Sequence, residues 1–201
     1  TEWSIGNRKT FFPNPEPDSF YSGNSAPDPI AGTVQNYYAF QWGDGLFIVL
    51  DPFWNSNHSA GTDNWAFTLG SAQYQWLKQT LASSQARFKF IFLHHLVGGL
   101  DSSQRGGIEA AKFFEWGGYE LDGTYTFPQK RPGWEMPIHQ LLVKYNVSMV
   151  FHGHDHLFVK QDLDGIVYQE VPQPGFPRFN QAQSAAQYGY VNGTILGSPG
   201  H

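Results

Sequence analysis

The chain has 201 residues, no cysteine, and a formal charge of −5 from 12 Lys and Arg against 17 Asp and Glu. The absence of cysteine excludes disulfide frameworks, thiolate metal sites and cysteine nucleophiles. The acidic balance weighs against nucleic acid as a partner, because a polyanion needs a basic face. The length fits one domain or part of a larger one, and no apolar run is long enough to form a membrane span.

Residues 1–36 are predicted to form an irregular segment rich in proline and glycine. Five prolines fall between positions 13 and 29. Because proline lacks a backbone N–H and has a fixed φ, no helix can run through these positions, and any strand there must be short or at a sheet edge. We expect this segment to lie over a folded body formed by residues 37–201.

Strand and helix signals alternate through that body. An aromatic run at 36–42 and an apolar run at 46–51 are predicted as two strands joined by a hairpin turn, the second buried on both faces. Apolar residues spaced by three or four predict a helix over 71–81. The other expected elements are a strand at 88–93, a long insertion at 96–134, a helix at 135–145, a strand at 147–151, strands at 157–161 and 166–171, and a loop-like tail from residue 172 without a final strand. This order predicts an α/β fold of mixed β-sheets with flanking helices.

Five of the eight histidines follow two of the predicted strands. His94 and His95 end one strand, and His152, His154 and His156 end the other. Ligand sites in such sheets gather beyond the carboxyl ends of the strands, so the two groups are expected to meet in one cleft. The alternate spacing of the second group lets imidazoles point to the same side, and neutral imidazole is a ligand for transition metals. A single His-x-His has a plainer explanation, because polar residues are common at strand ends.

The two phrases that contain these histidines, Phe-Leu-His-His at 92–95 and Phe-His-Gly-His-Asp-His at 151–156, resemble the last two motifs of the calcineurin-like metallophosphoesterases. That superfamily includes the purple acid phosphatases. The resemblance implies a four-layer αββα sandwich. The earlier family motifs, Asp-x-His and Gly-Asn-His, are absent, so residues 37–201 resemble the C-terminal half of such a domain, with the N-terminal half absent from this chain.

The resemblance further implies a dinuclear metal site built from two divalent or trivalent transition-metal ions (Fe, Mn or Zn). His94 and His154 would share one ion and His156 would bind the other, while the remaining ligands would come from the missing half. The implied reaction is hydrolysis of a small phosphoester, as a phosphatase or phosphodiesterase, by a metal-bridging hydroxide nucleophile.

Three further residues are candidates for catalysis or substrate binding. His95 and His152 match no ligand position; they are expected to orient ligands or donate a proton, or else to be ordinary hydrogen-bonded histidines at strand ends. Arg105, within the insertion, is a candidate phosphate clamp, and a plain surface arginine is the alternative.

Other functional hypotheses compete with the hydrolase. The chain could be a catalytically incomplete fragment or a non-enzymatic metal-binding module, since it has nitrogen ligands but lacks the family carboxylates. An amidohydrolase-like barrel fits poorly, because its His-x-His comes early in eight βα units and this chain has too few helices. An extracytoplasmic location is favoured, because related bacterial proteins are often exported and the composition is compatible with export.

Overall fold

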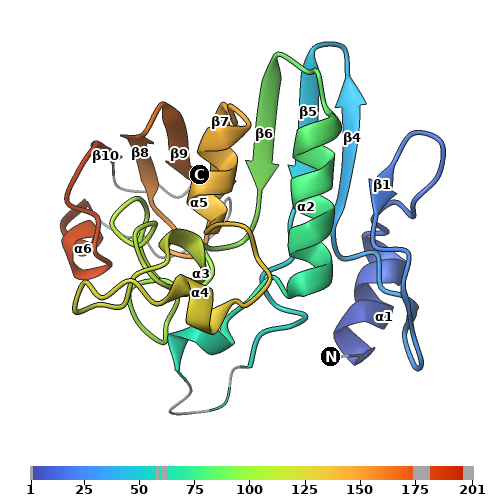
Figure 1. The fold of residues 1–201 in the computed structure, drawn as a ribbon, viewed down its shortest axis with the longest axis horizontal. Helices are drawn as coiled ribbons and strands as arrows, with labels where there is room; N and C mark the ends of the chain where they lie inside the picture. The colour runs from blue at the N-terminus through green and yellow to red at the C-terminus, as the bar shows by residue number, and fades with distance from the viewer. Residues whose placement is uncertain (1, 58, 60–62, 174–181, 197–201) are drawn as a thin grey trace.

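A computed structural model describes residues 2–57, 59, 63–173 and 182–196 of the chain (Figure 1). These residues contain a mixed sheet of eight strands, in which β5, β6, β7 and β9 run parallel and the remaining pairs are antiparallel. In spatial order the strands are β1 (Ser22–Gly23), β4 (Tyr38–Trp42), β5 (Gly45–Val49), β6 (Phe88–Phe92), β7 (Met149–His152), β9 (Ile166–Glu170), β8 (Phe158–Leu163) and β10 (Thr194–Leu196). The α/β class predicted from the sequence is confirmed.

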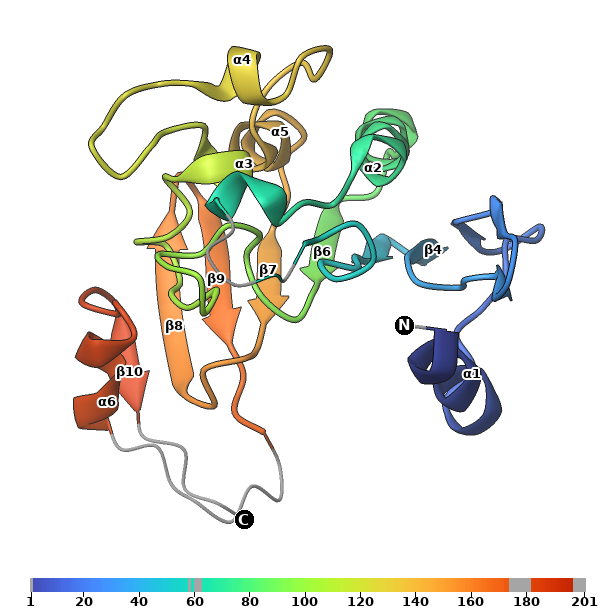
Figure 2. The same cartoon turned by 90° about the horizontal axis from the view of Figure 1, so that it is seen from below.

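Four helices from the middle of the chain lie together on one side of this sheet (Figure 2). They are α2 (Ser71–Ser83), α3 (Phe114–Gly117), α4 (Phe127–Lys130) and α5 (Ile138–Lys144), and a short 3-10 turn, η1 (Asn64–Ala66), lies near them. The main core forms between α2, α5 and the covered face of the sheet, where Ile48, Ile91 and Val150 are fully buried. No helix among the described residues is long and apolar enough to cross a membrane.

The expectation for residues 1–36 is partly wrong. A helix, α1, occupies Glu2–Phe11. It ends just before Pro13, so the physical reason for excluding a helix holds only for the proline-rich part. Within that part the strands have two residues each: β1 at the sheet edge, and β2 (Pro27–Asp28) paired with β3 (Gly32–Thr33).

The expectation for the tail is also wrong where the tail is described. Helix α6 occupies Ala182–Gln187, and β10 pairs with β8, with Ile195 opposite Val159. A strand of only three residues leaves almost no periodic signal in a sequence. Pairing with β8 nevertheless satisfies backbone groups that would otherwise lie along an open edge. The predicted loop also covers 174–181 and 197–201, which lie outside the described residues.

The face of the sheet opposite α2, α3, α4 and α5 is aromatic. Strand β5, expected to be buried on both faces, buries Leu46 and Ile48 but leaves Phe47 and Val49 only half-buried. Rings from neighbouring strands stack along this side, with centroid distances of 5.1 Å for Phe40–Phe47, 5.3 Å for Phe47–Phe90 and 4.9 Å for Phe92–Phe151. We call this surface, made by Phe40, Phe47, Phe90, Phe92 and Phe151, the aromatic face.

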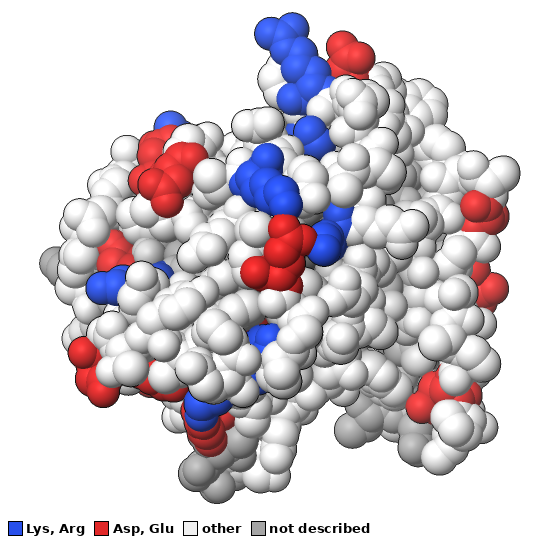
Figure 3. Space-filling view, in the orientation of Figure 1, with Lys and Arg blue, Asp and Glu red and all other residues white. Residues whose placement is uncertain are grey.

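Charged side chains are interspersed on the helix side. Lys and Arg atoms lie beside Asp and Glu atoms in the view of Figure 3 and form no single-sign patch among the residues described there. One such group links two helices: Lys78 and Lys144 each approach the carboxylate of Glu135 to 2.5 Å. These hydrogen bonds from the two lysines lower the pKa of Glu135 to about 2.

We expect the Glu135 carboxyl to titrate near pH 2 in a side-chain NMR titration of the folded protein. A pKa depressed on folding means that the stabilisation is fully present above the ordinary glutamate pKa of about 4.3 and is lost as the pH falls toward the folded value. Lys144→Ala should move the midpoint upward, whereas Lys144→Arg should not. A midpoint in the ordinary glutamate range for the unmodified protein would contradict the paired geometry.

Candidate metal centre

The sheet ladder itself brings the two histidine-bearing strand ends together. Strands β6 and β7 are parallel neighbours, with Phe92 opposite Phe151. Their pairing continues past the strands: the Leu93 N–H donates to the Phe151 carbonyl at 3.1 Å, and the Gly153 N–H donates to the His94 carbonyl at 2.9 Å. His94 is therefore fixed beside the turn that carries His154.

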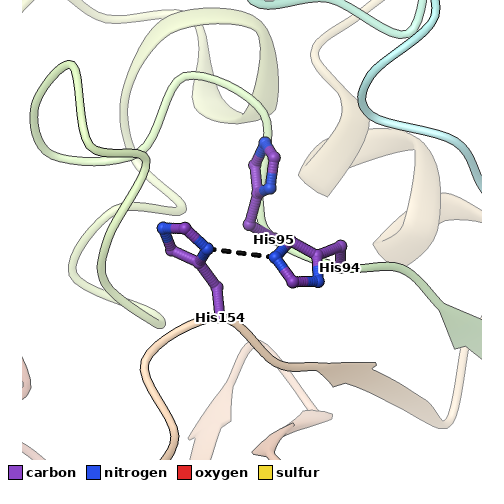
Figure 4. A group of neighbouring side chains, drawn as sticks. All are labelled: His94, His95 and His154. Atoms are coloured by element: carbon purple, nitrogen blue, oxygen red, sulfur yellow. Dashed lines mark hydrogen bonds between the residues drawn. The ribbon is translucent and has the colours of Figure 1, made fainter. Parts of the chain in front are cut away.

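Three imidazoles converge at this point (Figure 4). His94, His95 and His154 each offer a ring nitrogen, and these nitrogens all lie within 4.8 Å of one another. His94 Nε2 and His154 Nδ1 are 3.0 Å apart. Two nitrogens bound to one ion at about 2.0–2.1 Å are themselves about 2.9 Å apart when their bonds meet at a right angle and about 3.4 Å apart in a tetrahedral site. The described residues therefore fit a metal ion shared by His94 and His154, with His95 alongside.

The backbone orients the ring of His154. Its Nε2 lies 2.6 Å from the carbonyl oxygen of Ser103, which can only accept, so Nε2 carries the proton. The lone pair of His154 is then on Nδ1, which faces His94. A hydrogen bond on the far nitrogen is the usual device that fixes the tautomer and direction of a ligating histidine.

His94 is biased toward its neutral form. Its pKa is lowered from the ordinary value, first because partial loss of hydration disfavours the imidazolium and then because His154 and His156 repel a positive charge there. A neutral imidazole keeps a lone pair for a metal, so less proton competition opposes binding.

Some of the histidines predicted from the sequence lie in the cluster and others lie outside it. His94 and His154 come together as expected. His95, predicted as a catalytic histidine, is buried and joins them, with its ring 5.5 Å from that of His154. His156, predicted as a ligand, lies outside the group of three but near enough to influence His94. Its assignment to a second ion remains a prediction.

The turn that carries His154 and His156 has an unusual backbone. His154 has φ 91° and His156 has φ 58°, both in the left-handed region that residues with a Cβ rarely adopt. Strain of this kind persists only where the surroundings fix the chain. Gly153, just before the turn, is not required sterically, because a Cβ there would meet nothing closer than 3.8 Å.

Asp155, between the two strained histidines, is the residue that ties the turn down. Its side chain is buried, and it accepts hydrogen bonds from the Gly106 N–H at 3.0 Å and from the Tyr190 hydroxyl at 2.8 Å. The Arg105 guanidinium approaches its other oxygen to 3.3 Å. Arg105 also stacks over the ring of Tyr188 at 3.8 Å, so its place is at the rim of this turn. Its predicted role with phosphate remains a prediction.

A second buried carboxylate supports the same turn from below. Glu170, at the end of β9, accepts the Asp155 backbone N–H at 3.0 Å and lies 2.8 Å from His152 Nδ1. Burial raises the pKa of Glu170, and the hydrogen bond with His152 opposes that rise. His152 is thereby placed under the turn rather than in the histidine cluster, and its Nε2 is buried without a hydrogen-bond partner among the described residues.

Sequence reasoning missed Glu170 and Tyr190. Glu170 had a usable signal, because a carboxylate inside the largely apolar strand at 166–171 needs a buried partner. Tyr190 had none, since it lies in the segment predicted as loop.

Comparison with known proteins gives structural likeness only. No protein-family model matches the chain, and no curated protein matches it. Among solved structures, the chain is similar to PhoD, with 16% identity and a TM-score of 0.51 over 85% of this chain and 33% of that chain. Weaker likenesses are to purple acid phosphatase PPD1 from yellow lupin (Lupinus luteus) seeds, with 16% identity and TM-score 0.38 over 69% of this chain and 23% of that chain, and to GAP50, the anchor in the inner membrane complex of Plasmodium, with 15% identity and TM-score 0.35 over 68% and 36%.

The likeness to PhoD shows the fold. The α/β arrangement, with its large mixed sheet flanked by helices, is consistent with a metallophosphoesterase-like fold. The chain spans about a third of the PhoD chain that it resembles.

Asp155→Asn is expected to lower the free energy of unfolding by about 1–3 kcal/mol, because it removes the charge of a buried carboxylate that accepts hydrogen bonds from Gly106 and Tyr190. It should also weaken metal binding by roughly tenfold or more, as loss of a supporting hydrogen bond does at metal sites. Denaturant unfolding and calorimetric titration with Zn²⁺ measure the two effects. The matched control is Asp162→Asn on β8, where the carboxylate is exposed. Equal behaviour of the two variants would show that the turn does not depend on Asp155.

Proposed function

We propose that this chain contributes part of the active centre of a metal-dependent phosphoester hydrolase. The observation that carries the proposal is the convergence of His94, His95 and His154 beyond the carboxyl ends of β6 and β7. The fold shared with PhoD supports it, as do the sequence phrases around these histidines. The substrate class is a small phosphoester.

Two bound transition-metal ions (Fe, Mn or Zn) would neutralise phosphate charge and activate water for attack. In this proposal His94 and His154 hold one ion and His156 helps to hold the other. The nearby carboxylates are not available as ligands: Asp155 is engaged by Gly106, Tyr190 and Arg105, and Glu170 by His152. Oxygen ligands for a dinuclear centre must then come from outside the cluster.

The chain's other residues take supporting roles in the proposal. His95, buried beside His154, is the histidine best placed to exchange a proton with a bound phosphoester. His152 acts indirectly, by holding Glu170 under the turn. Arg105 sits at the rim, where one face of its guanidinium covers Tyr188 and its edge reaches Asp155, and we propose that it also contacts phosphate there.

We propose further that the aromatic face packs against a second β-sheet, as in a four-layer αββα sandwich, and that residues 37–201 form the C-terminal half of that domain. Stacked phenylalanines on half-buried strand positions are what an inner sheet surface presents to a partner sheet. The second sheet, supplied by an N-terminal half outside this chain, would bring the oxygen ligands that the histidine cluster lacks.

A metal-binding module without hydrolytic activity is the second candidate function. The described residues that meet in the cluster supply nitrogen donors alone. Such a set holds one ion more weakly than a dinuclear centre with bridging carboxylates would. Ion stoichiometry therefore separates the two functions.

Purified protein that includes the proposed N-terminal half, loaded with Mn²⁺, Zn²⁺ or iron, is expected to hold two ions per chain by plasma mass spectrometry and to hydrolyse 4-nitrophenyl phosphate or its diester. His154→Ala should remove an ion and lower turnover by roughly a hundredfold, since it deletes a ligand outright. His139→Gln is the matched control, because His139 binds Tyr168 and Asp164 away from the cluster. One ion or none, without hydrolysis by any loaded form, would identify the module instead.

The aromatic face has its own test. Residues 1–201 expressed alone should associate with increasing concentration in sedimentation velocity, because an uncovered apolar surface seeks a partner. Phe47→Thr with Phe90→Thr should reduce that association, whereas Val143→Thr, on the exposed side of α5, should not. A monomeric wild-type chain that unfolds cooperatively would count against a missing partner sheet.

A further inference from the structure

A cavity of about 730 Å³ lies next to the histidine cluster. His94 lines one side of it, and the other sides come from α1, from residues 14, 34 and 36 before β4, and from the segment that follows β5. Its size falls within the range of small-molecule sites, about 300–1,000 Å³. The cavity therefore begins where a phosphoester bound at His94 would project its organic substituent.

Arg8, on α1, is the one Lys or Arg among the described residues that line the cavity. Its Nη2 donates to the carbonyl oxygen of Val34, which fixes the side chain against the cavity wall. Its Nη1 is buried and has no hydrogen-bond partner among the described residues. A buried donor of this kind is costly unless something accepts its hydrogen bond. Arg8 also lines the cavity, and an anion bound there would supply the acceptor that this donor lacks.

Asp51, the acidic residue on the cavity wall, does not form an ion pair with Arg8 among the described residues. Asp51 accepts hydrogen bonds from Asn36 Nδ2 at 2.7 Å and from the Phe53 N–H at 2.8 Å, one on each carboxylate oxygen. Burial lowers the pKa of Arg8, and the more distant charge of Asp51 opposes that change and helps to keep the guanidinium protonated.

Two aromatic side chains line the same cavity as Arg8 and His94. Phe53 and Trp54 line the cavity and are 47% and 37% exposed. The Phe53 ring is 5.2 Å from the rings of both His94 and His95. A flat ring leaving the histidine cluster would pack on these residues in offset or edge contact.

We propose that this cavity binds the organic substituent of the phosphoester, and that this substituent is an aromatic ring bearing an anionic oxygen. Arg8 receives the anion by a charge-assisted hydrogen bond, Phe53 and Trp54 pack against the ring, and the scissile phosphate lies at His94. The proposal rests on the proposed hydrolase function for its phosphate end. The binding of the aromatic anion itself does not need a metal.

The test measures binding of 4-hydroxybenzoate, the alcohol released from 4-carboxyphenyl phosphate, to metal-free protein by tryptophan fluorescence or calorimetry. Wild-type protein should bind it, and phenol, which lacks the anion, should bind roughly tenfold more weakly or worse. Arg8→Gln should weaken 4-hydroxybenzoate binding by a similar factor. Arg87→Gln is the matched control, because Arg87 is exposed at the opposite end of β6.

Because Arg8 also anchors α1, two further variants keep the test decisive. Arg8→Lys retains the charge and should keep most of the affinity, and Trp54→Ala, at a partly exposed position, should weaken binding several-fold without changing the circular dichroism spectrum. Unaltered binding in both Arg8→Gln and Trp54→Ala, or equal binding of phenol and 4-hydroxybenzoate, would overturn the proposal.

Hydrolysis by the metal-loaded protein separates this proposal from the function on which it rests. The ratio of kcat/KM for 4-carboxyphenyl phosphate over phenyl phosphate should exceed one and should fall toward one in Arg8→Gln. If 4-hydroxybenzoate binds through Arg8 but no ester is hydrolysed, the cavity assignment stands and the hydrolase fails. If both esters are hydrolysed with a ratio that Arg8→Gln leaves unchanged, the hydrolase stands and the cavity assignment fails.

Discussion

The parallel pairing of β6 with β7 is the constraint on which the rest of the site depends. Its hydrogen bonds continue beyond the strands, from Leu93 to Phe151 and from Gly153 to His94, so the chain stays paired into the turn that carries His154. Two segments about sixty residues apart thereby present imidazole nitrogens 3.0 Å apart. A shift of the register by one residue would point His94 to the opposite face, because side chains alternate along a strand. The core residues Ile91 and Val150, buried on the helix side, oppose such a shift.

That constraint alone does not explain the turn itself, which costs free energy. His154 and His156 adopt positive φ, and each such residue costs of order 1–3 kcal/mol. Asp155 and Glu170 offset the cost by accepting hydrogen bonds from buried donors, and Tyr190 joins them from the C-terminal segment. Burial of both carboxylates costs free energy. A network with this cost is expected where the geometry of the turn has a function. Geometry of this kind is typical of ligand sites, where supporting groups fix the direction of the ligands.

The sequence predicts the helices and strands with periodic apolar residues well, and it predicts the turns and the residues from irregular segments poorly. The hairpin at 36–51, the helix from Ser71 and the strand before His94 have clear periodicity, and each is present within a few residues of its expected bounds. The histidine phrases predict that His94 and His154 meet. They do not predict that His95 joins in place of His156, because that choice depends on a left-handed backbone that no periodicity encodes. Tyr190 and Arg8 reach the site from the two ends of the chain, where proline and glycine leave little pattern to read.

The two faces of the sheet differ in how completely they are covered. Helices cover the face that carries Ile48 and Ile91, while the face that carries Phe47 and Phe90 is left half-buried. A cluster of nitrogen donors stands at the end of the same strands. If a second sheet covers the aromatic face, its strand ends come to the same edge as the histidines, and that is where carboxylate ligands would be needed. Packing of the second sheet would then both cover the aromatic face and supply the carboxylate ligands. The cavity beside Arg8 would lie at the border of that metal centre. Metal affinity and sheet association are therefore expected to rise and fall together in variants of the aromatic face, although those side chains touch no ligand.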